Sequence, residues 1–238
     1  MKKTFIVLSL GFLLGCSKDE PTSSTTSNSI AGITLPTSDA GLYTVFSNIE
    51  GDEAMQNSAW FGTPNASIDA GNVSYKVGSA NKTLTYFNGK YYGIDFIPDS
   101  FAVTDWTVAG KNGFPAMTVK DDQKMPIISS FKPDVTKVTS TTSSFRVTNS
   151  LVNNADVLIY GLVKLSNQND NKYFKASSAS SLSYTFSNAD FKPFIQTNNG
   201  VVGIPFTLTA LKYKTVTVNG KNVLVVKQYT YWGAVEVQ

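Results

Sequence analysis

Few residues of this 238-residue chain could carry out catalysis. It contains no histidine and a single cysteine, Cys16. The lack of imidazole excludes Ser-His-Asp and Cys-His nucleophilic catalysis, and it excludes zinc or iron sites that use His ligands. The chemistry that remains is that of carboxylates, lysine, tyrosine and hydroxyl groups. We therefore predict a protein that is not an enzyme and that has no cofactor and no metal.

The tightest acidic group is Glu50, Asp52 and Glu53, in the stretch NIEGDEAMQ. Two carboxylates about 5 to 9 Å apart can hydrolyse a glycosidic bond. A carboxylate-dependent polysaccharide hydrolase is therefore the alternative function. The same stretch fits a turn that leads into a short helix, because acids are favourable in the first turn of a helix. We favour the turn, and residues 52–60 are the best helical candidate.

Two loops are rich in the oxygen ligands that Ca²⁺ prefers. They are residues 69–72 (DAGN) and residues 166–171 (SNQNDN). Neither loop has the spacing of an EF-hand, and Asn and Asp also dominate ordinary turns because their side chains bond to their own backbone. We favour ordinary turns, and calcium binding stays an open alternative.

Aromatic residues offer a binding hypothesis. They make up 12% of the chain and include adjacent pairs. In a strand, one member of such a pair points inward and its neighbour outward, and an outward ring can stack on a sugar or anchor a protein. The same rings also suit the half-buried ends of a small sandwich. The candidates for ligand binding are Trp60, Tyr91, Tyr92, Tyr231 and Trp232.

The position of Cys16 suggests a different use for its thiol. Residues 1–15 begin with Met1 and two lysines and continue with an apolar stretch of about eleven residues, which suits a secretion signal and is too short to span a bilayer as a helix. The run Leu13-Leu14-Gly15-Cys16 that follows resembles a bacterial lipobox, although Leu14 is bulkier than is usual there. The resemblance implies that Cys16 becomes lipidated and is the first residue of the mature chain.

Residues 17–20 (SKDE) refine the expected location. They resemble the charged segment that follows the lipidated cysteine in Bacteroidota-type lipoproteins and directs export to the outer face of the outer membrane. The resemblance implies a lipid-anchored outer-membrane protein exposed at the cell surface, with attachment facing the periplasm as the alternative. The partner implied by the anchor is the membrane.

Composition shifts divide the mature chain. Residues 16–35 are rich in Ser and Thr and predict a flexible tether behind the anchor. The polar stretch at residues 120–124 is the sharpest interruption in the middle of the chain. We therefore predict an N-terminal β-sandwich over residues 36–122 and a C-terminal one over residues 126–238.

Strand signals recur along both halves. Residues 181–186 alternate polar and apolar side chains, and residues 156–163 are apolar on both faces, which indicates an inner strand. Asn-Gly pairs at residues 88–89 and 219–220 lie between β-rich runs and predict hairpins, although the lysine after each glycine would also allow longer loops. Ser187 and Asp190 have the spacing of a capping box at a single helical turn.

These signals predict an all-β fold with two antiparallel β-sandwich domains. The C-terminal half resembles an immunoglobulin-like or fibronectin-type-III module in length and strand spacing, and the whole chain is similar to uncharacterised Bacteroidota surface lipoproteins built from such modules. Without the signal peptide, Lys+Arg falls from 20 to 18 against 17 acids. This balance, with single scattered cations, predicts no nucleic-acid binding.

The favoured function is a non-catalytic surface module that binds a glycan or protein ligand or has a structural role in an envelope assembly. This function accounts for the expected cell-surface location, the tether, the strand pattern and the missing catalytic residues. A weaker third hypothesis is an inhibitor or immunity-like lipoprotein that acts through one loop.

Overall fold

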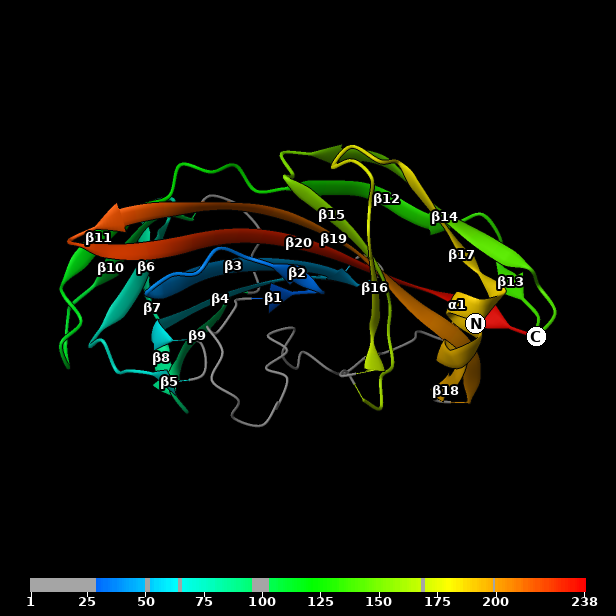
Figure 1. Ribbon diagram of the computed structural model, residues 1–238, viewed down its shortest axis with the longest axis horizontal. Helices are drawn as coiled ribbons and strands as arrows, with labels where there is room; N and C mark the ends of the chain where they lie inside the picture. Colours follow the sequence, from blue (N-terminus) through cyan, green and yellow to red (C-terminus); the bar gives the residue numbers. More distant parts are fainter. Residues whose placement is uncertain (1–28, 50–51, 64–65, 96–102, 168–169, 199) are drawn as a thin grey trace.

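The chain folds into β-strands over most of its length (Figure 1). The computed structural model describes residues 29–49, 52–63, 66–95, 103–167, 170–198 and 200–238. The helical segments within these ranges are a single turn, α1 (Asn188–Phe191), and the 3₁₀ turn η2 (Lys192–Phe194) that follows it. The prediction of an all-β sandwich is confirmed.

The largest sheet extends along the whole molecule (Figure 1). Its strand order is β16-β15-β19-β20-β3-β4-β9-β8. The pair β20 and β3 is parallel, whereas the other neighbours on this path are antiparallel. Short strands β13, β18 and β5 pair with β20, β19 and β4. The bounds are β3 (Ala40–Ile49), β4 (Asp52–Thr63), β5 (Ala66–Ser67), β8 (Thr85–Phe87), β9 (Lys90–Asp95), β13 (Lys137–Val138), β15 (Val157–Leu162), β16 (Lys172–Lys175), β18 (Gln196–Asn198), β19 (Val201–Val218) and β20 (Lys221–Val237).

A long hairpin, β19 and β20, forms the centre of this sheet. Its two strands have 18 and 17 residues and pair in unbroken register from Gly203 to Val218. The turn is Asn219-Gly220, with φ of +50° and +75°, as a two-residue type I′ turn requires. Asn88-Gly89 joins β8 to β9 in the same way, with φ of +48° and +77°. Both predicted hairpins are confirmed, and both loops have two residues.

Two smaller sheets pack against the large one, near opposite ends of the long hairpin (Figure 1). One has the order β11-β10-β6-β7 and the other the order β12-β14-β17. Their bounds are β6 (Val73–Val77), β7 (Ala80–Thr83), β10 (Val103–Val108), β11 (Met117–Lys120), β12 (Ile127–Pro133), β14 (Ser144–Asn153) and β17 (Ser183–Ser187).

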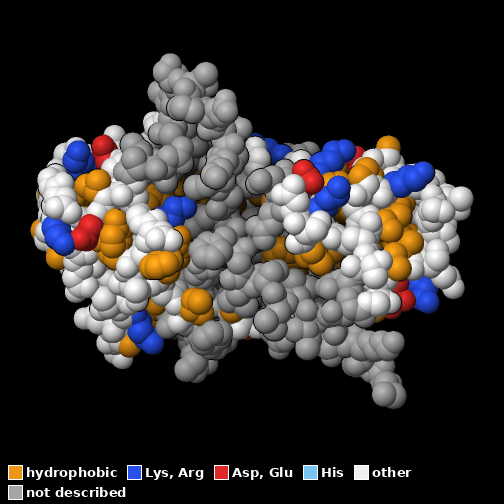
Figure 2. Space-filling view, turned by 90° about the horizontal axis from the view of Figure 1, so that it is seen from below, with side chains coloured by type: hydrophobic (Ala, Val, Ile, Leu, Met, Phe, Trp, Pro, Cys, Tyr) orange, Lys and Arg blue, Asp and Glu red, His pale blue; other side chains and the backbone are white. Residues whose placement is uncertain are grey.

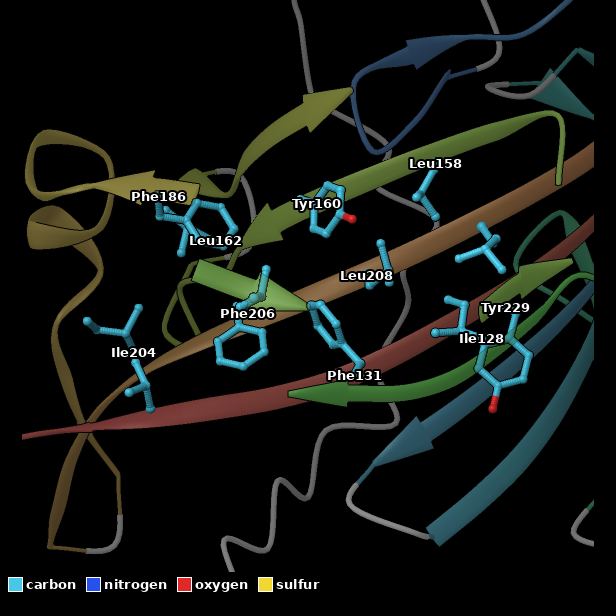
Figure 3. Close-up of a cluster of buried hydrophobic side chains, with 14 of the residues drawn as sticks. Ile128, Phe131, Leu158, Tyr160, Leu162, Phe186, Ile204, Phe206, Leu208 and Tyr229 are labelled. Carbon is cyan, nitrogen blue, oxygen red and sulfur yellow. The ribbon is translucent and has the colours of Figure 1, made fainter. Parts of the chain in front are cut away.

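Both small sheets lie on the same face of the large sheet, as the odd-numbered residues of β20 show. Val223 and Val225 pack into the core beneath the four-stranded sheet, which we call the first core and which contains Trp106. Tyr229 and Val235 pack into the core beneath the three-stranded sheet, which we call the second core (Figure 3). Because side chains alternate along a strand, one face of β20 contributes to both cores.

The opposite face of the large sheet also carries buried apolar side chains. They include Tyr43, Trp60 and Leu224, and they are covered by the small hairpin of β1 (Ser29–Ile30) and β2 (Ile33–Thr34). Ile30 and Leu35 are 4% and 2% exposed. The predicted tether over residues 16–35 is therefore too long, since its apolar end packs on the sheet and the described fold begins before Pro36.

The predicted division into residues 36–122 and 126–238 does not separate two sheets. β3 and β4 come from the first half and lie beside β20 and β19 from the second. The tip of the long hairpin completes the first core, because Val223 and Val225 lie in it. The two sandwiches thus share one continuous layer, and neither half contains all the strands of its own core.

Local signals had mixed outcomes elsewhere. β15 is buried along its whole length, as predicted for an inner strand. The capping box at α1 is also confirmed, since the Ser187 hydroxyl accepts from the Asp190 N–H and the Asp190 side chain accepts from the Ser187 N–H. The helix proposed for residues 52–60 is wrong. This segment is strand β4, whose odd residues Met55 and Ala59 face the two cores while it pairs with β3 and β9.

Candidate functional site

The residues predicted to form a site are not brought together. Cys16 lies outside the described residues. Trp60 is 4% exposed and Tyr91 1% exposed, on opposite faces of the large sheet. Trp60 lies over Gly41 of β3, and its indole N–H donates to the Tyr43 hydroxyl at 3.3 Å. These two rings belong to the packed interior, so the hypothesis that they stack on a surface ligand is wrong.

The other three aromatic candidates are half-buried. Tyr231 packs edge-on against Phe131 of the second core, with ring centroids 5.8 Å apart. Tyr92 and Trp232 lie on the opposite face of the large sheet, the face of Trp60, as their strand registers show. They are six residues apart in strand register, which corresponds to about 20 Å along the strands. A single small ligand therefore cannot contact both rings.

The acidic stretch forms no catalytic pair within the described residues. Glu50 lies outside them, and Asp52 is the first residue of β4. Glu53 accepts a hydrogen bond from the Asn48 side chain at 3.1 Å, across the β3–β4 hairpin. Asp52 and Glu53 thus belong to strand β4, where the sequence had indicated a turn into a helix.

In the loop at residues 69–72, the carboxylate of Asp69 is bound by other groups of the protein. Asp69 accepts hydrogen bonds from Lys111 Nζ at 2.5 Å, from the Tyr91 hydroxyl at 2.8 Å and from the Gly71 N–H at 2.9 Å. These donors, Lys111 first, hold the pKa of Asp69 at about 2, below its ordinary value of 3.8. In the second loop, the Asn171 side-chain oxygen accepts from the Lys164 N–H at 2.8 Å. The Asp69 carboxylate and the Asn171 amide therefore both stabilise the loops in which they lie.

Eight carboxylates pair with eight different cations among the described residues. No carboxylate or cation is shared between two of these pairs. Figure 2 shows lysines and arginines scattered singly or in small groups over the described part of one face. Glycoside hydrolysis needs two carboxylates that converge on one bond. The observed pairing instead commits each of these eight acids to a separate structural contact.

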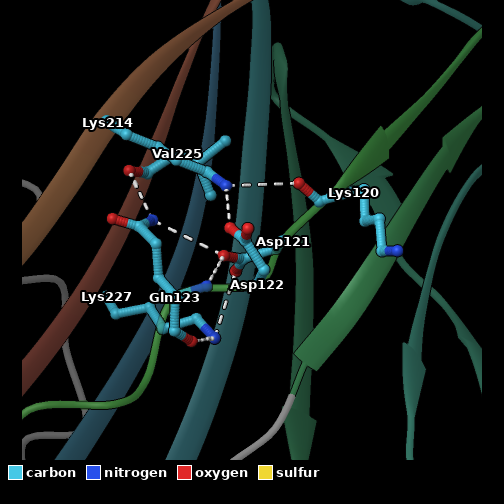
Figure 4. A network of polar contacts seen from close by, with 7 residues as sticks. All are labelled: Lys120, Asp121, Asp122, Gln123, Lys214, Val225 and Lys227. Carbon is cyan, nitrogen blue, oxygen red and sulfur yellow. Dashed lines mark hydrogen bonds and ion pairs between the residues drawn. The ribbon is translucent and has the colours of Figure 1, made fainter.

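One ion pair differs from the others because it is buried. Lys227 of β20 and Asp121, which follows β11, approach to 3.3 Å, and both side chains are 1% exposed. Asp121 belongs to the polar stretch of residues 120–124 that had marked the predicted domain boundary, and we call this stretch the strap. The strap lies against the long hairpin (Figure 4). It runs between Val119 of the first core and Met125 of the second.

Further contacts fix the strap in place. The Gln123 side chain donates to the Val225 carbonyl at 3.3 Å, and the Gln123 carbonyl accepts from Lys227 Nζ. On the outer side, Lys214 Nζ pairs with Asp122 and donates to the Lys120 carbonyl at 3.4 Å. The strap therefore contacts both strands of the hairpin, whereas the sequence indicated only a boundary between two domains at this stretch.

Burial dominates the electrostatics of the Lys227–Asp121 pair. It raises the pKa of Asp121 and lowers the pKa of Lys227, while the attraction between the two charges acts in the opposite direction on each. Perturbed groups of this kind often mark active sites that open into a cleft. Here both side chains are sealed from solvent, so the arrangement suits a structural connection between the two cores.

Sequence reasoning missed this pair, although a signal was present. Lys227 interrupts the apolar run VLVVKQY at residues 223–229, which forms a buried strand. A lysine in such a position needs a partner because an isolated buried charge is very costly. The partner lies more than 100 residues away, at Asp121, and the sequence gives no way to choose it among the acids.

None of the helices in the described residues has the length and apolar character to cross a bilayer. The described residues also contain no group of three or more Cys, Asp or Glu side chains placed to hold a metal ion.

Comparison with known proteins gives no family assignment. No protein-family model matches the chain, and no curated protein has a similar sequence. Among solved structures, domains A168–A170 of titin match 83% of this chain and 62% of their own at 11% identity, with a TM-score of 0.25. The FN1–FN3 domains of chicken CNTN1 match 82% of this chain and 63% of their own at 11% identity, with a TM-score of 0.28. Neither TM-score reaches 0.5, so neither likeness assigns a function to this chain.

Proposed function

We propose that this chain is a lipid-anchored protein of the outer membrane, displayed at the cell surface. It binds a glycan or protein ligand there or serves as a structural module. The location rests on the sequence of residues 1–20, with Cys16 as the lipidated residue. The non-catalytic role rests on the one-to-one pairing of eight described carboxylates with eight different cations, which leaves these acids engaged in structural contacts.

The anchor is tested by metabolic labelling of the full chain with radioactive palmitate, followed by membrane fractionation. We expect label and membrane attachment in the natural chain, and loss of both in Cys16→Ser. Digestion of intact cells with a protease then reports the side of the membrane, since a surface-exposed chain is degraded. A Cys16→Ser chain that stays in the membrane fraction would contradict the anchor. Protection in intact cells but not in lysed cells would favour the periplasmic side.

Ligand binding is tested with the half-buried rings that remain as candidates. The natural chain, Tyr92→Ala and Trp232→Ala are applied to a glycan array and used to capture envelope proteins. Phe87→Ala is the matched control, because Phe87 is 65% exposed on the edge strand β8 and was not a predicted site residue. Loss of one ligand in a candidate variant, with the control unchanged, supports the binding role. Release of reducing ends from a polysaccharide by the natural chain would refute the non-catalytic assignment.

A further inference from the structure

The junction between the two cores contains buried polar atoms that have no hydrogen-bond partner within the described part of the chain. They are both amide atoms of Asn57, Thr44 Oγ1, Gln123 Oε1 and Asp121 Oδ2, the last of which is ion-paired with Lys227. Asn57 and Thr44 are 0% and 1% exposed. Buried polar groups in native proteins are nearly always hydrogen-bonded, to protein or to ordered water, so such a concentration calls for an explanation.

Strand register places these residues side by side. Thr44 of β3 pairs with Lys227 of β20 on one side and with Asn57 of β4 on the other. Neighbouring strands are about 4.8 Å apart, so the three residues form one row across the sheet. The strap reaches this row through Asp121 and Gln123, which both contact Lys227.

The row lies on the face that carries both cores. Thr44 falls between Leu42 of the first core and Phe46 of the second, and Asn57 falls between Ala59 of the first core and Met55 of the second. Residues at intervals of two along a strand share a face. The polar atoms therefore form a layer that separates two apolar clusters, with the strap against it.

We propose that this layer is an internal water site. Asn57 Nδ2 is a donor, whereas Asn57 Oδ1, Asp121 Oδ2 and Gln123 Oε1 are acceptors, and a hydroxyl such as that of Thr44 can play either role. A buried water typically makes two to four hydrogen bonds to groups of this kind. Water bound here bridges the strap to β3 and β4 and so completes the junction.

The donor set fits water better than a metal cation. A cation cannot accept a hydrogen bond from Asn57 Nδ2, and the ammonium of Lys227 already supplies a positive charge beside the only carboxylate of the set. Water can accept from the amide and donate to two oxygens at once. The positive charge of Lys227 does not oppose its binding.

The first test measures the sign of a stability change in the full chain. Thr44→Val and Asn57→Leu remove polar atoms from the layer with little loss of volume. If water bridges the layer, each change breaks the bridge and leaves Gln123 Oε1 without a partner, so the folding equilibrium constant falls about tenfold or more. If no water is present, replacing these atoms by apolar groups removes the desolvation penalty of burying them unpaired, and the folding equilibrium constant rises. A rise in both variants would overturn the proposal.

The second test detects the water directly. In the NMR spectrum of the full chain, the side-chain amide protons of Asn57 should show cross-relaxation with a long-lived water molecule, and this signal should disappear in Thr44→Val. Thr209→Val is the matched control, because the Thr209 hydroxyl is also buried in the large sheet but has a direct partner in Thr230 at 3.1 Å. The control should keep the Asn57 signal. Absence of a water contact at Asn57 in the natural chain would refute the proposal even if a variant fails to fold.

Discussion

Removal of the Asp121 carboxylate should destabilise the protein far more than any surface charge change. In Asp121→Ala, the ammonium of Lys227 stays buried at 1% exposure and loses the carboxylate that lies 3.3 Å from it. At 3.3 Å and an effective dielectric constant of about 20, the lost attraction amounts to about 5 kcal/mol. Variants that break one side of a buried pair lose about 3 to 5 kcal/mol in practice. We expect a loss in this range in the free energy of unfolding.

The assay is urea denaturation followed by tryptophan fluorescence and circular dichroism. Asp122→Ala is the matched control, because the Asp122 carboxylate is 76% exposed beside Lys214, and an exposed pair contributes little or nothing measurable. In the double variant Asp121→Leu, Lys227→Met, no charge remains unpaired, so the loss should be smaller than the sum of the two single losses. If Asp121→Ala unfolds at the same urea concentration as Asp122→Ala, the reasoning about the buried pair is refuted.

Three further predictions use local features. The contact with Lys111 holds the pKa of Asp69 at about 2, below 3.8, so the stability this carboxylate contributes is present above pH 3.8 and is lost as pH falls toward 2. Asp69→Asn should accordingly flatten the acid side of a pH–stability curve, and an unchanged curve would contradict this. Gly220→Ala forces a side chain into φ of +75° where nothing lies within 4 Å, so denaturation should show a loss of about 1 to 2 kcal/mol from backbone strain alone. Gly41→Ala should cost more, about 3 kcal/mol, because its Cβ would lie 2.3 Å from Trp60 Nε1. Equal losses in the two glycine variants would argue against the close packing of Trp60.

Features that depend on a few neighbouring residues were predictable. The Asn-Gly turns need positive φ at two positions, and Ser187 and Asp190 satisfy each other within one helical turn, so each signal carries its own cause. β15 was recognisable because a continuous apolar run has no polar face to expose. Such local signals are enough to predict an all-β fold, because each depends on residues that are close together in the sequence.

Features set by distant partners were not predictable. The strap has the composition of a linker, and only its contacts with Lys227 and Val225 explain its burial. Trp60 alternates with its neighbours as an outward ring would, but alternation does not tell which face another segment covers. β4 begins with acids that suit a helix, yet pairing with β3 and β9 outweighs that local preference.

The parallel pairing of β3 with β20 has a consequence for how the protein is made. Asp39, just before β3, bonds to Asn222 of β20, 183 positions later in the chain. During synthesis the early strands therefore leave the ribosome long before the strand that must lie beside them, and closing so large a loop is slow. Until β20 has been made, β3 has no strand to pair with on the edge that β20 later occupies. The central layer of the fold is therefore completed only when the last strand of the chain has been made.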